Sequence, residues 1–332
     1  MGDPAGIGPE AIVGAWRNAS IHDSCRPFVV GHPEILRRAA QGMGFPGEVR
    51  AITSPMEAQP SLEQIPCLKA VCDDVLAMAP ALVDARGGQA AYDSLVTAAR
   101  MAIAREIACV VTAPLHKGAL WLAGHRYPGH TELLAELCGV DRFAMLLYLP
   151  PCAAIRSAQG LAIVHVTLHK ALRDVFAGLT VEEIVAKTLL LDDFLHRLHL
   201  ARPRIGVCAL NPHAGEDGLF GNEEQLLIRP AVERVVRQCI DASGPLPADT
   251  LIARARDGEF DGVVAMYHDQ GHIPIKLLAM HDAVNVTLGL PIIRTSVAHG
   301  TAFDKAWQGR VESSGMVAAI VTAARLARQQ NA

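Results

Sequence analysis

The sequence lacks several features that would place it in a large class of proteins at once. Its 332 residues carry a formal net charge of only −4 with histidine neutral, so no broad basic surface for nucleic acid or membranes is expected. No C-x-x-C pair occurs among its eight cysteines, and no apolar run or signal peptide is visible that would direct it into or across a membrane. These absences favour a cytoplasmic protein with reduced thiols, in which individual, placed cations would hold an anionic ligand.

The common nucleotide and hydrolase motifs are also absent. There is no Walker loop, no G-x-G-x-x-G and no G-x-S-x-G. The chain opens instead with a glycine-rich loop, Gly2-Asp-Pro-Ala-Gly-Ile-Gly-Pro-Glu10, in which Pro9 and Glu10 suit the first turn of a helix. Because such a loop normally follows a strand, we expect the start of the chain to be truncated or misassigned.

The rest of the chain alternates between apolar runs of strand length and amphipathic stretches of helix length. With 51% hydrophobic and 19% charged residues, this pattern predicts an α/β fold with a largely parallel sheet and two compact lobes. Strands are expected at residues 27–31, 108–112, 143–149, 161–168, 205–210, 262–266 and 283–288. Helices are expected at residues 33–41, 89–107, 132–137, 180–198, 223–240 and 315–329, and Pro230 is a candidate for a kink in the fifth of these. Thr180 and Asp249 are expected as helix caps, and residues 45–85 have no assignment.

Three of these apolar runs end in a histidine. His169 follows the run that starts at Leu161, His213 follows the run that starts at Ile205, and His268 follows the run that starts at Gly262. In open α/β sheets the carboxyl ends of strands face the ligand site, and three imidazoles suit a catalytic divalent metal. The alternative is that each histidine is an ordinary surface or hydrogen-bonded side chain.

Polar residues near the end of the chain suggest an anion site. Lys276, Asn285 and Arg294 could grip a phosphate or carboxylate, or the two cations could be ordinary surface residues. The apolar flank of Arg294 argues against a free surface position. The segment from His299 to Asp304 places Gly300 between polar groups, which allows a close backbone approach to a ligand, although by itself it is equally well a simple loop.

Taken together, the polar motifs resemble the 4-hydroxythreonine-4-phosphate dehydrogenase (PdxA) family, a relative of the isocitrate and isopropylmalate dehydrogenases. The motifs occur in order along nearly the whole chain and are highly specific in combination. They are Gly2-Asp-Pro-Ala-Gly-Ile-Gly-Pro-Glu10, Thr112-Ala-Pro-Leu-His-Lys117, Gly129-His-Thr-Glu132, Asn211-Pro-His-Ala-Gly-Glu216, Tyr267-His-Asp-Gln-Gly271, Leu290-Pro-Ile-Ile-Arg-Thr-Ser296 and His299-Gly-Thr301.

The resemblance implies two α/β/α lobes, residues 1–126 plus 297–332 and residues 127–296, with the active site in the cleft between them and a homodimer partner that completes it. It implies a divalent metal (zinc, magnesium or cobalt) and NAD or NADP. The implied metal ligands are His169, His213 and His268, and the implied substrate contacts are His130, Thr131, Lys276, Asn285 and Arg294. His299, Gly300 and Thr301 would line the cofactor, and Lys117, Asp249 and Asp269 are candidates for proton handling or support of the site.

The implied reaction oxidises a 4-phosphorylated 3-hydroxy acid to a β-keto acid, which then loses CO₂. The segments 271–278 and 301–307 look closer to the branch that acts on 4-phospho-D-threonate or 4-phospho-D-erythronate than to the vitamin B6 branch, and His116 and residues 151–159 also depart from the family pattern. Two alternatives stay open. One is a cis-dihydrodiol dicarboxylate dehydrogenase, a branch that shares Val166-Thr-Leu-His169 but tends to lack the arginine at position 294. The other is a non-catalytic protein that binds phosphometabolites.

Overall fold

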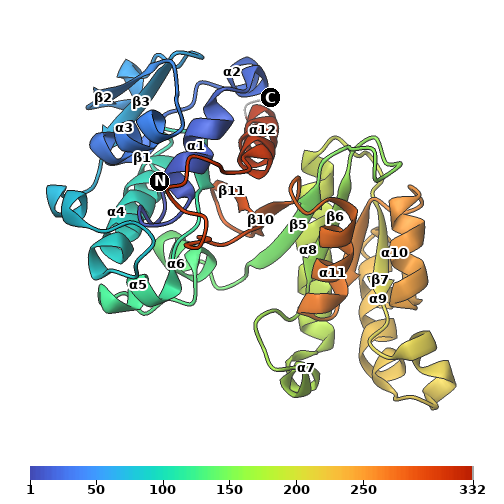
Figure 1. The fold of residues 1–332 in the computed structure, drawn as a ribbon. Coiled ribbons are helices and arrows are strands. Elements are labelled where there is room, and N and C mark those ends of the chain that lie inside the picture. Colours follow the sequence, from blue (N-terminus) through green and yellow to red (C-terminus); the bar gives the residue numbers. More distant parts are fainter. Residues whose placement is uncertain (331–332) are drawn as a thin grey trace. The chain divides into compact units, whose positions relative to one another are not determined.

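A computed structural model of the chain describes residues 1–330, which fall into two compact units (Figure 1). Unit 1 comprises Met1–Asp141 and Leu290–Ala332, and unit 2 comprises Arg142–Gly289. The resemblance implies boundaries at residues 126 and 296, whereas the units divide at residues 141 and 289. As a result His130, Thr131 and Arg294 belong to unit 1.

Unit 1 is built on parallel strands. One sheet has the order β1 (Val29–Gly31), β3 (Gln64–Lys69) and β2 (Glu48–Ile52), all parallel. A second parallel pair joins β4 (Cys109–Thr112) to β11 (Ile293–Val297). Strands β2 and β3 lie in the stretch that the sequence pattern left unassigned, because short strands interrupted by proline and turn residues show no clear period.

Helices cover these strands. Helix α4 (Ala85–Ile103) packs on β1 and β4, and α12 (Ser314–Gln330) packs on β4 and β11 (Figure 1). Helix α1 (Gly8–Trp16) packs against α3 (Pro33–Gly42) and α12. The other helices of unit 1 are α2 (Ala19–Ser24), α5 (Lys117–Leu122) and α6 (His130–Cys138), with one-turn helices at Pro55–Glu57 and Asp73–Ala77.

The start of α1 shows how the opening loop is held. Pro9 lies in the first turn of the helix, as its missing N–H predicts. Glu10 is buried, and its carboxylate accepts hydrogen bonds from the backbone N–H groups of Trp307 and Gly309 at 2.6 and 2.7 Å. Glu10 therefore ties the first helix to the segment that precedes α12, in addition to lying at the positive end of its helix.

Unit 2 contains a mixed sheet. Its strand order is β10 (Val284–Leu288), β5 (Ala144–Leu149), β6 (Leu161–His165), β9 (Gly262–Ala265), β7 (Arg204–Cys208) and β8 (Asp241–Leu246). The four strands from β6 to β8 are parallel to one another, so their carboxyl ends lie at one edge of the sheet.

The expectation of a largely parallel sheet fails for β5, which is antiparallel to both β10 and β6. Only residues 150–160 separate β5 from β6, and they form no helix. A parallel connection needs a longer crossover, usually through a helix, so this short excursion returns the chain antiparallel to itself.

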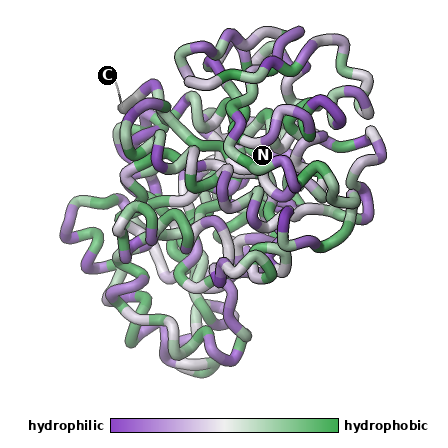
Figure 2. The backbone as a smooth tube through the Cα atoms, turned by 90° about the vertical axis from the view of Figure 1, so that its left-hand side faces the viewer, coloured by the Kyte–Doolittle hydropathy of each residue, from purple (hydrophilic) through white to green (hydrophobic). Residues whose placement is uncertain are grey.

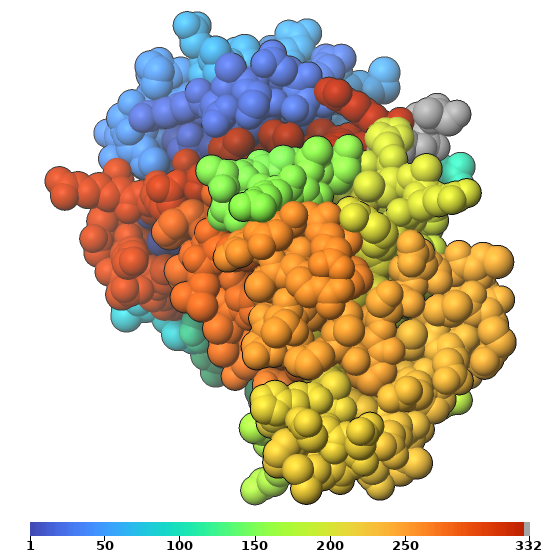
Figure 3. Space-filling view, turned by 90° about the vertical axis from the view of Figure 1, so that its right-hand side faces the viewer, coloured from blue at the N-terminus to red at the C-terminus, as the bar shows by residue number. Residues whose placement is uncertain are grey.

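The helices of unit 2 are mostly those that the sequence predicts. Helix α8 (Val181–Arg197) begins after Thr180, whose hydroxyl accepts the Glu183 N–H at 3.1 Å, which confirms the predicted cap. Helix α11 (His268–Ala279) follows β9 directly. Figure 3 shows the face of this unit that is covered by α9 (Arg229–Val236) and α10 (Ala248–Arg256), in gold and orange. The remaining short helices are Leu172–Asp174, α7 (Val175–Gly178) and Pro212–Gly218.

Of two predictions in this region, the interruption of a helix at Pro230 is confirmed and the cap at Asp249 is wrong. The helix expected at residues 223–240 is divided into a π-helical turn, Glu224–Ile228, and α9, because Pro230 lacks the N–H that would continue the ladder and occupies the first turn of a new helix. Asp249 does not cap α10. It lies inside the first turn, and the capping position is occupied by Pro247 without a side-chain bond.

The described residues contain neither a membrane-spanning helix nor a disulfide bond. No helix among residues 1–330 is long and apolar enough to cross a membrane, and Figure 2 shows hydrophobic and hydrophilic segments interspersed along the chain. All eight cysteines are free thiols. Burial raises the pKa of Cys67, Cys109 and Cys208 to about 12, which keeps these thiols protonated and unreactive.

Candidate functional site

Arg294 is the most deeply buried cation among the candidates. It lies within β11 with 2% of its surface exposed, and its guanidinium donates a hydrogen bond to the Thr112 hydroxyl on neighbouring β4 at 2.7 Å. Burial lowers the pKa of Arg294 to about 10, while the nearby Glu132 carboxylate acts in the opposite direction. The guanidinium therefore remains charged at neutral pH inside unit 1.

The amino end of α6 lies within reach of this charge. The helix begins at His130, and the preceding Gly129 supplies no side-chain cap for the first N–H groups. Burial, followed by the charge of Arg294, lowers the pKa of His130 well below 6.5, so this imidazole is neutral at physiological pH. His130 and Thr131 thus combine free helix N–H groups with neutral side-chain donors beside a buried cation, an arrangement suited to an anion.

The candidate cofactor loop, His299 to Thr301, contacts the glycine-rich loop at the start of the chain. The backbone N–H of Ile7 donates to the Thr301 carbonyl at 3.0 Å, and a Cβ atom on Gly6 would lie 2.9 Å from the Thr301 Cβ. The His299 ring contacts the Gly300 carbonyl at 3.0 Å, and a Cβ atom on Gly300 would meet no protein atom within 4 Å. The candidate cofactor loop therefore packs on the glycine-rich opening loop and leaves Gly300 facing open space.

Lys117 and its neighbour have different positions. Lys117 is exposed at the start of α5. The His116 ring nitrogen accepts the Ala119 N–H at 3.2 Å and so caps α5, while its ring stacks on Phe303 with centroids 4.9 Å apart. The departure from the family pattern at position 116 therefore has a structural role at this helix start.

In unit 2 the structure gathers imidazoles at the carboxyl edge of the parallel strands. His169 follows β6 and His268 begins α11 after β9, and their ring centroids are 5.8 Å apart. The Asp269 carboxylate contacts the His268 Nδ1 atom at 2.7 Å. This contact would orient the ring and leave its Nε2 atom for another partner, which is how carboxylates support metal-bound histidines.

Two further histidines join this cluster, and the sequence analysis had not singled them out. His272 stacks on His268 with centroids 3.6 Å apart, and its Nδ1 atom lies 3.1 Å from the His165 Nε2 atom. Burial lowers the pKa of His165 to about 3 and of His272 to about 4, so both rings are neutral at pH 7. The sequence could have indicated His272, because residues four apart on a helix, such as His268 and His272, lie on the same face.

His213 follows β7 at the same sheet edge but has other neighbours. Its side chain is exposed, its Nδ1 atom lies 3.1 Å from a Glu216 carboxylate oxygen, and its ring meets Phe220 edge-on with centroids 6.3 Å apart. The five consecutive residues 213–217 all have positive φ, four of them non-glycine residues, in the region that such residues rarely adopt. The segment thus holds a costly backbone conformation.

These positions fit a divalent metal in part. Neutral imidazoles are suitable donors, and the His169–His268 pair with its Asp269 support could supply two of three protein ligands. Across residues 1–330, however, no group of three or more His, Cys, Asp or Glu side chains is arranged to hold a metal. The third expected ligand, His213, is therefore not gathered with the other two.

The remaining candidates of unit 2 are dispersed. Lys276 is exposed on α11, two turns after His268. Asn285 lies on β10, and its Oδ1 atom is buried without a hydrogen-bond partner, which leaves an acceptor for a ligand hydroxyl. Asp249 is exposed in the first turn of α10, with no contact to the imidazole cluster among the interactions described.

The fold is of the α/β class, and its candidate site residues form two groups: a buried arginine near the uncapped amino end of α6 in unit 1, and an imidazole cluster in unit 2. The chain is similar to the crystal structure of a 4-hydroxythreonine-4-phosphate dehydrogenase from Klebsiella pneumoniae, with 41% identity, a TM-score of 0.87 and 98% of each chain covered. It is 42% identical to a D-threonate 4-phosphate dehydrogenase of Pectobacterium atrosepticum over 98% of both chains. It is 44% identical to a 4-hydroxythreonine-4-phosphate dehydrogenase of Geobacter metallireducens, over 99% of this chain and 94% of the relative.

The family model described as pyridoxal phosphate biosynthetic protein PdxA matches residues 23–323. The chain belongs to the PdxA family, and it is a dehydrogenase of that family. The resemblance seen in the sequence is thereby confirmed, as is the α/β class of the fold.

Proposed function

We propose that the chain catalyses the NAD-dependent oxidation and decarboxylation of a 4-phosphorylated C4 3-hydroxy acid, with 4-phospho-D-threonate as the leading substrate. Oxidation of its C3 hydroxyl would give a β-keto acid, and loss of CO₂ would leave a phosphorylated three-carbon ketone. The relatives named D-threonate 4-phosphate dehydrogenase support this choice, as does the segment from Gly271 to Leu278. The nearest competing substrate is 4-hydroxythreonine 4-phosphate, the substrate named for other relatives.

One observation carries the proposal: the uncapped amino end of α6 beside a buried arginine. Helix N–H groups that lack a side-chain cap favour an anion, and Arg294 supplies a charge that never titrates near neutral pH. His130 and Thr131 add neutral donors at the same helix end. A phosphate dianion uses charge and several donors together, whereas a carboxylate needs fewer.

Each candidate residue then has a definite task. Arg294 would bind two phosphate oxygens, and the neutral His130 ring would donate to a third. In unit 2 the unpartnered Asn285 Oδ1 atom would accept a hydrogen bond from a substrate hydroxyl, and Lys276 would add a point charge. Asp269 would hold the His268 ring in one orientation at 2.7 Å. Lys117 and Asp249, both exposed, stay proposals for proton handling.

The cofactor and metal complete the proposal. NAD or NADP would accept the hydride, and a zinc, magnesium or cobalt ion would acidify the substrate hydroxyl. His299, Gly300 and Thr301 would line the dinucleotide, because that loop leaves Gly300 open to an approaching ligand. His169 and His268 would hold the metal, with His213 as the third ligand after a change in its own segment. We further propose a cytoplasmic homodimer whose partner completes each site.

A substrate panel tests the proposal. Purified protein would be incubated with NAD, a divalent metal and one of four compounds: 4-phospho-D-threonate, 4-phospho-D-erythronate, 4-hydroxythreonine 4-phosphate or a cis-dihydrodiol dicarboxylate. Absorbance at 340 nm reports reduced cofactor, and 4-phospho-D-threonate should give the highest kcat/KM. Turnover of the cis-dihydrodiol alone would contradict the proposal. Binding of a phosphorylated compound without any turnover would indicate a non-catalytic binding protein.

A further inference from the structure

A long loop in unit 1 joins β11 to α12 without forming a helix or strand. It comprises residues 298–313, includes the candidate cofactor residues 299–301, and passes beside the start of the chain (Figure 1). Connections of this length are uncommon in compact domains and are usually functional. Because the loop lacks the hydrogen-bond ladder of a helix or strand, contacts with other segments must hold it in one conformation.

Glu10 supplies two of these contacts. Its side chain is buried, and each carboxylate oxygen accepts one backbone N–H of the long loop: Oε2 from Trp307 at 2.6 Å and Oε1 from Gly309 at 2.7 Å. Hydrogen bonds to an ionised acceptor are about twice as strong as neutral ones. Glu10 also lies in the first turn of α1, where the helix dipole favours its negative charge.

The two residues that Glu10 holds have backbone conformations that need such support. Trp307 has a φ of 62° and Gly309 has a φ of 71°. This left-handed conformation is costly for a bulky residue such as tryptophan. Gly309 also packs tightly, because a Cβ atom on it would lie 2.7 Å from the Gly42 carbonyl oxygen at the end of α3. The carboxylate therefore holds the long loop in a turn that this sequence would not favour by itself.

The rest of the glycine-rich opening loop adds further contacts. The Trp307 indole N–H donates to the Pro4 carbonyl at 3.0 Å, and a Cβ atom on Gly6 would lie 3.3 Å from the Phe303 ring. Residues 2–10 are all buried, so they do not present their N–H groups at the surface as a phosphate-binding loop does. The opening motif thus contacts the long loop instead of forming a nucleotide site of its own.

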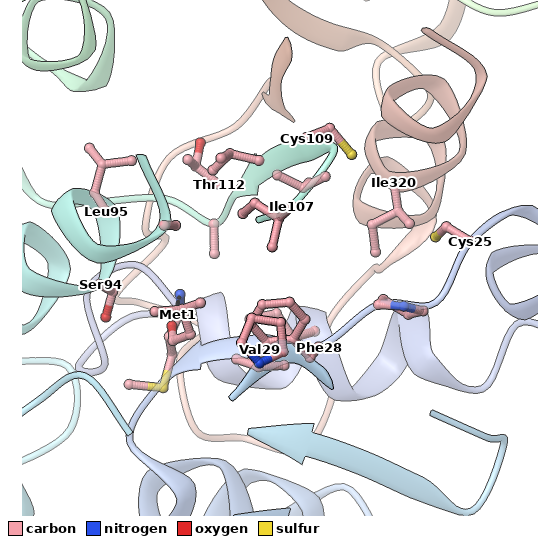
Figure 4. Close-up of a pocket in the computed structure, with 18 of the residues that line it drawn as sticks. Met1, Cys25, Phe28, Val29, Ser94, Leu95, Ile107, Cys109, Thr112 and Ile320 are labelled. Carbon is pink, nitrogen blue, oxygen red and sulfur yellow. Dashed lines mark hydrogen bonds between the residues drawn. The ribbon is translucent and has the colours of Figure 1, made fainter. Parts of the chain in front are cut away.

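The apolar cavity of unit 1 does not compete with this loop as a place for a dinucleotide. It has a volume of about 430 Å³, and Figure 4 shows Val29, Leu95 and Ile107 among the side chains around it. None of the described residues that line it lies between 298 and 313. Because apolar walls do not stabilise the charged phosphates of a dinucleotide, the open surface at Gly300 is the better candidate.

We propose that Glu10 is a positioning residue for the cofactor: through Trp307 and Gly309 it fixes the long loop so that the backbone at Gly300 faces an approaching dinucleotide. This inference rests on the proposed function and gives the opening motif a task in it. A loop that is already ordered loses less conformational freedom when its ligand binds. Loosening the loop should therefore weaken cofactor binding.

Glu10→Gln is the test variant. The amide has nearly the same shape, but its NH₂ group would face one of the two backbone donors, so one hydrogen bond is lost. The Kd for NAD, measured by isothermal titration calorimetry, should rise at least about tenfold, and the amides of residues 299–309 should exchange with solvent at least about tenfold faster. Ile65→Val, in the core on β3, is the matched control, because it should lower the melting temperature without changing either quantity.

Trp307→Phe is a second variant in case Glu10→Gln does not fold. It removes only the indole hydrogen bond to Pro4, so it should change NAD affinity and loop exchange in the same direction and by less. NAD affinity within about twofold of the wild type in both variants, despite faster exchange, would overturn the positioning role alone. Unchanged exchange, or an equal loss of affinity in Ile65→Val, would also overturn it. A wild type that binds no NAD would instead contradict the proposed function, and with it this task of Glu10.

Discussion

Two ionisable side chains are buried in unit 1, and the interior favours the charged form of one and the neutral form of the other near pH 6. Arg294 keeps its charge in the interior beside a threonine hydroxyl, whereas Asp3 is held in a setting that favours its neutral form. The first suits a ligand-binding charge, and the second suits a structural hydrogen bond. Each can be tested with a single substitution, because the expected change is specific to a substrate in one case and to pH in the other.

For Arg294, we expect Arg294→Met to lower kcat/KM for a 4-phosphorylated substrate by on the order of a hundredfold, the loss of a charge-assisted contact of ~3 kcal/mol. A non-phosphorylated analogue should scarcely change. Thr112→Val is the matched control, because it removes the observed partner of the guanidinium and keeps the charge. Equal losses for both substrates, together with a lower melting temperature, would mean that Arg294 only braces β11 against β4.

For Asp3, burial raises the pKa of the carboxyl from 3.8 to about 6, even though the Ala5 N–H donates to it at 2.9 Å. A raised carboxyl pKa means that the folded state binds the proton more tightly. The contribution of Asp3 to the free energy of unfolding is therefore fully present below about pH 4 and is lost as pH rises through about 6. Asp3→Asn should match the wild type near pH 4 and exceed it by about 2 to 3 kcal/mol at pH 7.

Denaturant melts of both proteins between pH 4 and pH 7 give this difference. Asp84→Asn serves as a control, because the Arg86 side chain lowers the pKa of Asp84 from 3.8, so its contribution is lost only below about pH 4 and its difference from wild type should stay nearly constant between pH 4 and pH 7. A constant difference between Asp3→Asn and wild type across the range would show that Asp3 does not titrate in this window.

At the scale of elements, the segment Pro212–Gly218 limits the candidate metal site. We expect a divalent metal to protect residues 212–218 from amide exchange, because His213 must leave its contacts with Glu216 and Phe220 to join His169 and His268. His213→Ala should abolish this protection and turnover without lowering the melting temperature. His196→Ala, an exposed histidine on α8, is the control. Unchanged metal content and activity in His213→Ala would remove it from the ligand set.

The loop from His299 to Thr301 offers a second test at this scale. A Cβ atom at Gly300 would meet no protein atom within 4 Å outside its chain neighbours, so Gly300→Val should fold normally and raise the KM for NAD at least about tenfold by blocking backbone approach. Gly6→Ala is the contrasting control, since its Cβ atom would lie 2.9 Å from the Thr301 Cβ and should lower the melting temperature. An effect of Gly300→Val on metal affinity alone would place the loop outside the cofactor site.

The sequence pattern predicted most elements but not all of their relations. Long periodic stretches such as α8, with its cap at Thr180, were identified correctly, because capping and periodicity are local. The strand β5 was predicted, but its antiparallel direction and the strands between residues 45 and 85 were missed, since pairing direction and short irregular strands depend on contacts distant in sequence. For the same reason His165 was passed over. Its role depends on a neighbour 107 residues away.

At the scale of the whole molecule, the family followed from motifs whose order spans the chain, and the α/β class followed from the alternation of strand-length and helix-length segments. The comparisons confirm both. The motifs did not predict how deeply each side chain is buried, whether it is charged, or what surrounds it. Burial of Arg294, the neutral form of His130 and the open surroundings of Gly300 come from packing that no motif specifies. The choice of substrate depends on such details, so a direct measurement of turnover is needed.

That measurement is the stoichiometry of one reaction. The protein would be supplied with NAD, a divalent metal and 4-phospho-D-threonate, and reduced cofactor would be followed at 340 nm while released CO₂ is trapped and counted. We expect one CO₂ for each NADH, and no NADH from unphosphorylated D-threonate at the same concentration. NADH without CO₂, or equal turnover of the unphosphorylated acid, would contradict an oxidative decarboxylase that recognises its substrate through the 4-phosphate.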